Sequence, residues 1–156
     1  MEPIIGTIEK NSVKTAQALN LILADEFLLY TKTKNAHWNL DKHDIHRRLM
    51  LFKEQYELLE ELMDSIAERI HATGYNIPAT LEIFLKLEHL VEQCQVKNDG
   101  IEFIAELLED HENLIIRLRK KAHYFGSELQ ESGVGTYIME LIKKHQQMIE
   151  SLKIYL

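Results

Sequence analysis

The sequence predicts an all-α protein, a bundle of four long helices with a long crossover between the second and the third. Three observations indicate this class. Apolar residues recur at helical spacing over long stretches, only six glycines and two prolines interrupt 156 residues, and strand-type alternation is absent. With 46% hydrophobic and 28% charged residues, we expect residues 1–156 to form one domain with a substantial core.

The first helix is expected to run from a cap at Asn11 or Ser12 to Asn39, because serine and asparagine side chains satisfy free backbone amides at helix starts. One face of this helix is apolar. Its members are Val13, Ala16, Leu19, Leu23, Phe27 and Tyr30.

The second helix, from an N-cap at Asp44 to a stop at Gly74, organises the rest of the chain. Its apolar residues alternate four- and three-residue steps, which is typical of a helix packed in a bundle. They are Ile45, Leu49, Phe52, Tyr56, Leu59, Met63, Ile66 and Ile70. A second apolar stripe of Leu51, Leu58 and Leu62 predicts a further neighbour, either a second subunit or a closely wrapping bundle.

A polar face of the second helix carries the first candidate site. Lys53, Glu57, Glu60, Asp64, Glu68 and His71 fall within a wedge of about 80°. Asp64 and Glu68 lie four residues apart, so both carboxylates can approach one metal ion or a basic partner. The same spacing is common on solvated helix faces, and that interpretation stays open.

The crossover after Gly74 contains Pro78 and a short apolar helix over residues 81–90. The third helix is expected from Asp99 to near Gly126, followed by a turn from Ser132 to Gly135. The fourth helix then runs from about Thr136 to the carboxyl end. Short, long and short connections in this order are those of a ferritin-like four-helix bundle.

His37 is the second candidate, beside Trp38 at the end of the first helix. A histidine in this place is usually a packing or capping residue. Asp64 lies about 30 Å along the second helix, whereas His37 is expected near its start. One subunit therefore cannot join His37 to Asp64, but two antiparallel copies related by a twofold axis can.

Four segments resemble the Dps family of mini-ferritins, the DNA-protection proteins of starved bacteria. They are LNLILADEFLLYTKTKNAHWN, FKEQY, MDSIAERI and GVGTYIMELIKKHQQM, and together they span nearly the whole chain. The resemblance implies a four-helix subunit with a short crossover helix and a dodecameric hollow shell. It also implies iron oxidation at sites shared across each twofold interface, with His37, Asp64 and Glu68 as metal ligands.

Two of the family's ligand positions differ in this sequence. Leu49 stands where the family has a second histidine, and Lys53 stands where it has Asp or Glu. Leucine cannot bind iron, and an ammonium group has no lone pair. One hypothesis is that Lys53 pairs with Asp64 and Glu68 across the dimer. The other is that His37, Asp64 and Glu68 still hold one iron or zinc ion.

Other acidic and histidine residues carry weaker signals for metal or pore roles. His43 and His46 lie near the site in sequence, but neither matches a ligand position of the family. Glu68-x-x-His71 has no counterpart in the fourth helix, so His71 is expected to be a helix-end residue. Glu128 and Glu131 line acidic entry pores in one interpretation and are ordinary solvated charges in the other.

Charge and cysteine content limit the partners and the location. The net charge of −7, and a segment 1–12 with one Lys against two Glu, argue against direct DNA binding. The single Cys94 suits a reducing compartment, and no apolar run is long enough for a membrane span. We therefore expect a cytoplasmic protein. The resemblance implies a ferroxidase that stores ferric iron and limits peroxide stress. The rivals are a structural shell with an impaired site and a DNA-protecting protein.

Overall fold

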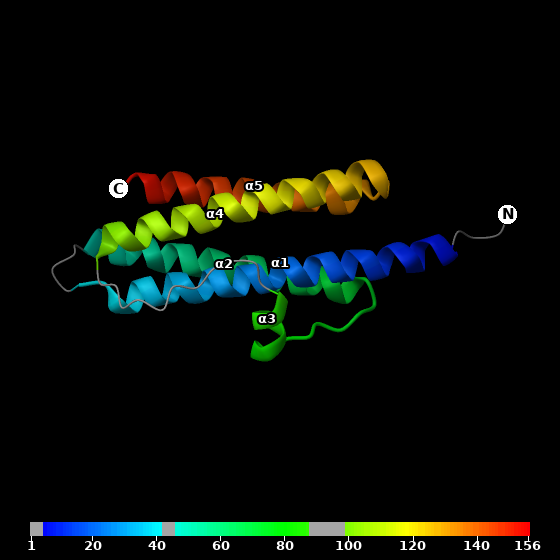
Figure 1. The fold of residues 1–156 in the computed structure, drawn as a ribbon, viewed down its shortest axis with the longest axis horizontal. Helices are drawn as coiled ribbons and strands as arrows, with labels where there is room; N and C mark the ends of the chain where they lie inside the picture. Colours follow the sequence, from blue (N-terminus) through cyan, green and yellow to red (C-terminus); the bar gives the residue numbers. More distant parts are fainter. Residues whose placement is uncertain (1–4, 42–45, 88–98) are drawn as a thin grey trace.

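The computed structural model describes residues 5–41, 46–87 and 99–156. Four long helices form an antiparallel bundle, with α1 and α2 in one layer and α4 and α5 in the other (Figure 1). The helices are α1 (Ile5–Asn39), α2 (His46–Ala72), α3 (Leu81–Leu87), α4 (Gly100–His123), the π-helical turn η1 (Tyr124–Glu128) and α5 (Ser132–Lys153). The predicted all-α bundle is confirmed, and no helix in the described ranges is long and apolar enough to cross a membrane.

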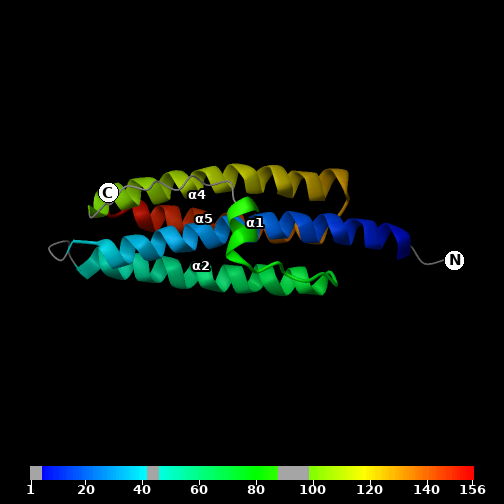
Figure 2. The ribbon, with the colours of Figure 1, turned by 60° about the horizontal axis from the view of Figure 1, so that its bottom comes forward.

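Helix α1 begins earlier than predicted, at Ile5 instead of after a cap at Asn11 or Ser12. The Asn11 side chain makes a tertiary contact, because its Nδ2 donates a hydrogen bond to Glu131 Oε1 at 3.0 Å. The first turns of α1 extend beyond the ends of the other helices (Figures 1 and 2).

Helix α2 begins at His46, and the predicted cap Asp44 and seam residue Ile45 lie outside the described residues. Its predicted stop is confirmed. Gly74 has φ +84°, a conformation that glycine adopts without strain, and its amide donates to the carbonyl of His71 at 2.9 Å.

The core contains residues from every long helix. Its largest fully buried side chains are Phe52, Phe125, Leu19, Ile22, Leu29, Leu59, Ile66, Ile70, Ile104, Leu114, Leu118 and Ile138. The predicted seam of α2 is buried at Phe52, Leu59, Ile66 and Ile70, whereas Leu49 is 36% exposed. In the second apolar stripe, the bundle itself buries Leu51 and Leu62, and Leu58 stays 39% exposed.

The crossover holds the predicted short helix, α3, which crosses the α1–α2 layer (Figure 2). Phe84 of α3 packs against Phe27 of α1 with ring centroids 4.9 Å apart. Residues 88–98, which include the end of the predicted segment and Cys94, lie outside the described residues.

Helix α4 begins where predicted, because Asp99 Oδ1 accepts a hydrogen bond from the amide of Ile101 at 2.9 Å. The α-helix ends at His123, and the chain continues helically through η1 to Glu128. Gly126 lies inside this π-helical turn and does not end the helix.

The predicted turn from Ser132 to Gly135 is wrong, because these residues form the first turn of α5. The amides of Val134 and Gly135 both donate to the carbonyl of Glu131. Gly135 serves a close contact between helices. A Cβ there would lie 3.2 Å from the carbonyl oxygen of Ala122 and 3.3 Å from the amide nitrogen of Gly126.

Candidate functional site

His37 lies in the last turn of α1, half-buried, with its ring edge-on to Tyr56 at a centroid distance of 5.4 Å. Its Nδ1 is buried and has no hydrogen-bond partner within the described ranges. Burial lowers the pKa of His37 below its usual 6.5, and the charges of Lys34 and Lys53 lower it further. The imidazole is therefore neutral at pH 7, with a lone pair that can bind a metal ion.

A cation on an aromatic surface flanks His37. Lys34 Nζ lies 3.7 Å from the ring centroid of Tyr56 and 5.7 Å from those of Tyr30 and Trp38. Such contacts hold an ammonium group over the negative face of a ring. The end of α1 thus combines a neutral histidine with a fixed positive charge.

Asp64 and Glu68 are exposed on the outer face of α2, together with the rest of the predicted polar wedge. Neither carboxylate forms an ion pair with another residue that the structure describes. Asp64 also borders a groove of about 690 Å³ between α2 and the crossover, which contains His71 as well.

The structure does not join His37 to the two carboxylates within one chain. Asp64 lies eight residues beyond Tyr56, about 12 Å further along α2. The predicted separation of about 30 Å is too large, because His37 packs on the third turn of α2 and not at its start. Across the described ranges, no three His, Cys, Asp or Glu side chains are grouped to hold a metal ion.

The two residues that depart from the Dps pattern lie on the surface of α2. Leu49 is exposed. Lys53 is also exposed, and its Nζ lies 3.7 Å from Glu57 Oε1, its neighbour one turn along the same helix. Within one subunit Lys53 therefore has a carboxylate partner and also contributes positive charge near His37.

The sequence matches the ferritin-like domain family over residues 16–156. The chain belongs to this ferritin-like family. DNA protection during starvation proteins are among its sequence relatives, and its fold is that of solved Dps structures.

Among the sequence relatives of this ferritin-like chain, an uncharacterized low temperature-induced protein of Nostoc is 32% identical over 97% of this chain and 85% of that protein. The DNA protection during starvation protein of Helicobacter pylori is 28% identical, over 92% of this chain and 99% of its own. The crystal structure of the Vibrio cholerae Dps protein superposes with a TM-score of 0.86 at 24% identity. It covers 94% of this chain and 91% of the other.

Other predicted residues of the ferritin-like chain lie apart from His37. His71 is exposed in the last turn of α2, as expected for a helix-end residue, and His46 is exposed at the start of α2. Glu128 is exposed in η1, and Glu131 accepts the hydrogen bond from Asn11. Their pore role stays a prediction, and His43 lies outside the described residues.

The sequence did not predict one group of three buried polar residues. Glu26 of α1, His111 of α4 and His145 of α5 form one hydrogen-bonded group in the bundle core. The signal that could have found them is a titratable residue at a core position. His145, for example, lies one turn from both Leu141 and Met148, which are buried.

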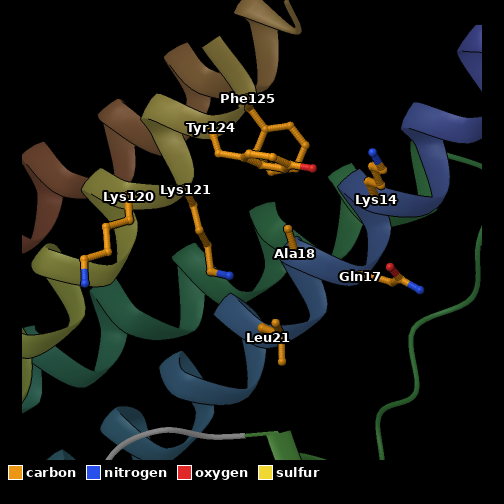
Figure 3. Close-up of a pocket in the computed structure, with 8 residues that line it drawn as sticks. All are labelled: Lys14, Gln17, Ala18, Leu21, Lys120, Lys121, Tyr124 and Phe125. Carbon is orange, nitrogen blue, oxygen red and sulfur yellow. The ribbon is translucent and has the colours of Figure 1, made fainter. Parts of the chain in front are cut away.

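A groove of about 480 Å³ between α1 and α4 gathers cations in this otherwise acidic chain (Figure 3). Its lysines are Lys14, Lys120 and Lys121, and Lys121 reaches from α4 toward α1 (Figure 3). Partial burial lowers the pKa of Lys121. Cations near the end of α4 also stabilise the negative end of its dipole, which gives Lys120 and Lys121 a structural role.

Proposed function

We propose that copies of this chain assemble into a hollow dodecameric shell that takes up Fe(II), oxidises it and holds the ferric product as a mineral. His37 of one copy and Asp64 and Glu68 of a facing copy bind the iron. Removal of free Fe(II) limits the radical chemistry that peroxide drives with it.

The observation that carries this proposal is a site divided into two incomplete halves. One half is His37, neutral and with an unpartnered buried Nδ1. The other half is the exposed pair Asp64 and Glu68, which have no cation partner among the described residues. Imidazole nitrogen and carboxylate oxygen are ligands that suit iron, and also zinc. Two antiparallel copies related by a twofold axis bring one half to the other.

Three protein ligands leave coordination positions open for water and an oxidant. With peroxide as the oxidant, two Fe(II) ions each give up one electron. Two protons are consumed, and the O–O bond breaks to leave two waters. The protein contributes the ligands, and the negative charge of Asp64 and Glu68 favours the ferric product over the ferrous substrate.

The alternative is a shell that keeps the assembly and has an impaired site, and Leu49 and Lys53 favour it. Lys53 already lies beside the carboxylate of Glu57. In this alternative, Lys53 pairs with Asp64 and Glu68 across the subunit contact, and its ammonium group takes the place of the metal charge.

Direct contact with DNA is not included in the proposal. The chain carries seven more negative than positive charges, and phosphate binding depends on clustered lysine and arginine. The three lysines of the α1–α4 groove are a local exception to this charge.

The deciding experiment is anaerobic Fe(II) titration by calorimetry, followed by peroxide addition with absorbance recording. It compares the wild type with Asp64→Asn, with Glu60→Gln as the matched control on the same exposed face, and with Leu49→His/Lys53→Asp. We expect saturable Fe(II) binding and oxidation by the wild type and by Glu60→Gln, and at least a tenfold loss in Asp64→Asn.

Two results would contradict the proposal. Equal binding by the wild type and Asp64→Asn would remove Asp64 from the site. If the wild type neither binds nor oxidises Fe(II) while the Leu49→His/Lys53→Asp variant does both, the impaired shell would be established instead.

A further inference from the structure

A chain of three buried titratable residues crosses the bundle core, and it includes none of His37, Asp64 and Glu68. Glu26 of α1 and His145 of α5 are fully buried, and His111 of α4 is 1% exposed. Glu26 Oε1 lies 2.7 Å from His145 Nε2, and His145 Nδ1 lies 2.9 Å from His111 Nδ1. Both contacts are hydrogen bonds, so one continuous chain links three of the four long helices.

The two ends of this chain have no hydrogen-bond partner. Glu26 Oε2 and His111 Nε2 are both buried, and neither is bonded within the described ranges. Buried polar atoms are nearly always satisfied, because an unmade hydrogen bond in the core destabilises the folded state. These two atoms therefore mark a place where the bundle is sensitive to a change of protonation.

The geometry does not suit a single metal ion. His145 uses opposite ring nitrogens for its two partners, so one ion cannot contact Glu26 and His111 together. The absence of a grouped ligand set in the described part of the chain agrees with this. The mobile species that these atoms can exchange is a proton.

The number of protons in the chain follows from its charge. The single carboxylate of Glu26 can balance one positive charge in the chain at most. A second proton would place an unpaired positive charge in the core, which is strongly unfavourable. Burial accordingly lowers the pKa of His111 well below 6.5, and the nearby charge of His145 lowers it further.

The neighbouring charges are already engaged with other partners. On α1 and α4, Lys32 contacts Glu106 and Asp110, and Arg117 contacts Asp25. On α5, Tyr137 is bonded to Ser65 of α2, and Glu140 is exposed. The nearby buried polar residue of α2 is Gln55, which is uncharged and donates to the carbonyl of Met148. None of these contacts supplies a counter-charge for a protonated His111.

We propose that the Glu26–His145–His111 chain is an acid-sensitive lock, which holds α1, α4 and α5 together while His111 is neutral and weakens the bundle when His111 takes up a proton. This inference goes beyond the proposed iron chemistry and does not depend on it. It predicts that mild acid destabilises each subunit through a change in its core and not through a change at the iron site.

The direction of the pH effect follows from proton linkage. The unfolded chain protonates His111 below about pH 6.5, whereas the folded chain keeps it neutral. The stability from His111 is therefore fully present above pH 6.5 and is lost as pH falls toward the lowered folded pKa. One such proton changes the unfolding constant by up to tenfold per pH unit.

The test measures unfolding by denaturant from pH 7.5 to 5.5, at fixed protein concentration and with chelator present. His111→Leu removes the proton that the unfolded state takes up at this position. The unfolding constant of this variant should therefore change less with pH than that of the wild type, by up to tenfold per pH unit. Glu26→Gln removes the carboxylate that contacts His145, so the buried chain loses its negative charge. The unfolding constant of this variant should therefore change more with pH than that of the wild type, by up to a further tenfold per pH unit.

The control is His71→Gln, which changes an exposed histidine outside the chain and should alter the slope less than His111→Leu does. His37 and the surface carboxylates are the same in all variants, so their contributions cancel. Wild-type slopes in both His111→Leu and Glu26→Gln would overturn the proposal.

A second measurement needs no variant of the core. In histidine-labelled wild type, NMR should show that His111 stays neutral at pH 6, because burial holds its pKa well below the usual 6.5. Protonation of His111 near pH 6.5 in the folded chain would refute the lock, even if His111→Leu or Glu26→Gln fails to fold.

Discussion

Lys32 shows how a buried charge is accommodated in this bundle. Its side chain is 7% exposed, and its Nζ contacts Glu106 Oε1 at 3.0 Å and also the carboxylate of Asp110. Burial raises the pKa of Asp110, while the hydrogen bond and the charge of Lys32 oppose that rise. The ammonium group therefore keeps a buried carboxylate ionised between α1 and α4.

Replacing Lys32 with methionine should destabilise the protein by about 3–5 kcal/mol at pH 7, because it leaves a buried carboxylate without its partner. The loss should shrink toward pH 5. Without Lys32 the pKa of Asp110 rises further above its unfolded value, so the folded state takes up a proton as pH falls. Urea unfolding at both pH values measures the difference.

The matched control is Lys86→Met, which breaks an exposed pair with Glu82 on α3. Exposed ion pairs one turn apart contribute about 0.5 kcal/mol or less, so this change should leave the free energy of unfolding nearly unchanged. A Lys32→Met/Asp110→Asn variant should recover much of the lost stability. A loss that is equal at pH 7 and pH 5 would contradict the role of Asp110.

At the scale of elements, the contact between α4, η1 and α5 depends on a glycine. A Cβ at Gly135 would meet backbone atoms of Ala122 and Gly126, which cannot move as a flexible side chain does. The start of α5 is also tied to α2, because Arg69 donates to the carbonyl of Gly133 at 3.1 Å and lies over the ring of Tyr137. Two helices thus fix the first turn of α5.

Gly135→Ala should therefore lower the free energy of unfolding by about 1–3 kcal/mol, as expected for overpacking. Gly133→Ala is the matched control in the same helical turn. Its Cβ would meet no atom closer than 3.9 Å, so alanine should be neutral or stabilise by up to about 1 kcal/mol through helix propensity. Thermal unfolding followed by circular dichroism compares the two, and equal stability of both variants would contradict the packing argument.

At the scale of the whole molecule, the subunit leaves large apolar side chains exposed on α2 and α3. They are Leu49, Met50, Leu58, Leu81 and Leu85. The bundle covers Leu51 and Leu62 of the second apolar stripe but not Leu58. If copies pack along this face, as the proposed shared site requires, Leu58 lies in or near their contact.

Leu58→Glu should then disrupt assembly without unfolding the subunit, because a buried unpaired charge at an interface is costly while glutamate suits an exposed helix position. Sedimentation should show the wild type near twelve times the 18.3 kDa chain mass and Leu58→Glu as a smaller species. Glu61→Gln, three residues away and exposed, should assemble as the wild type does. Full assembly of Leu58→Glu with unchanged helicity would place the contact elsewhere.

The sequence by itself determined the elements whose signals lie close together in the chain. The apolar spacing of α2, the Asp99 cap of α4 and the Gly74 stop were predicted and confirmed, because each depends on residues within a few turns. The predicted start of α1 was wrong. The Asn11 side chain contacts Glu131 across the bundle and does not act as the predicted cap.

Of the candidate site, the sequence predicted His37, Asp64 and Glu68 as metal ligands, and this assignment stays a prediction. Their meeting across two copies stays a prediction. Only the tertiary structure showed that Gly135 is a contact residue, and that Glu26, His111 and His145 form one hydrogen-bonded chain. Local spacing sets helix periodicity, but side chains as distant as Glu26 and His145 meet only when the packing of the helices closes the distance between them.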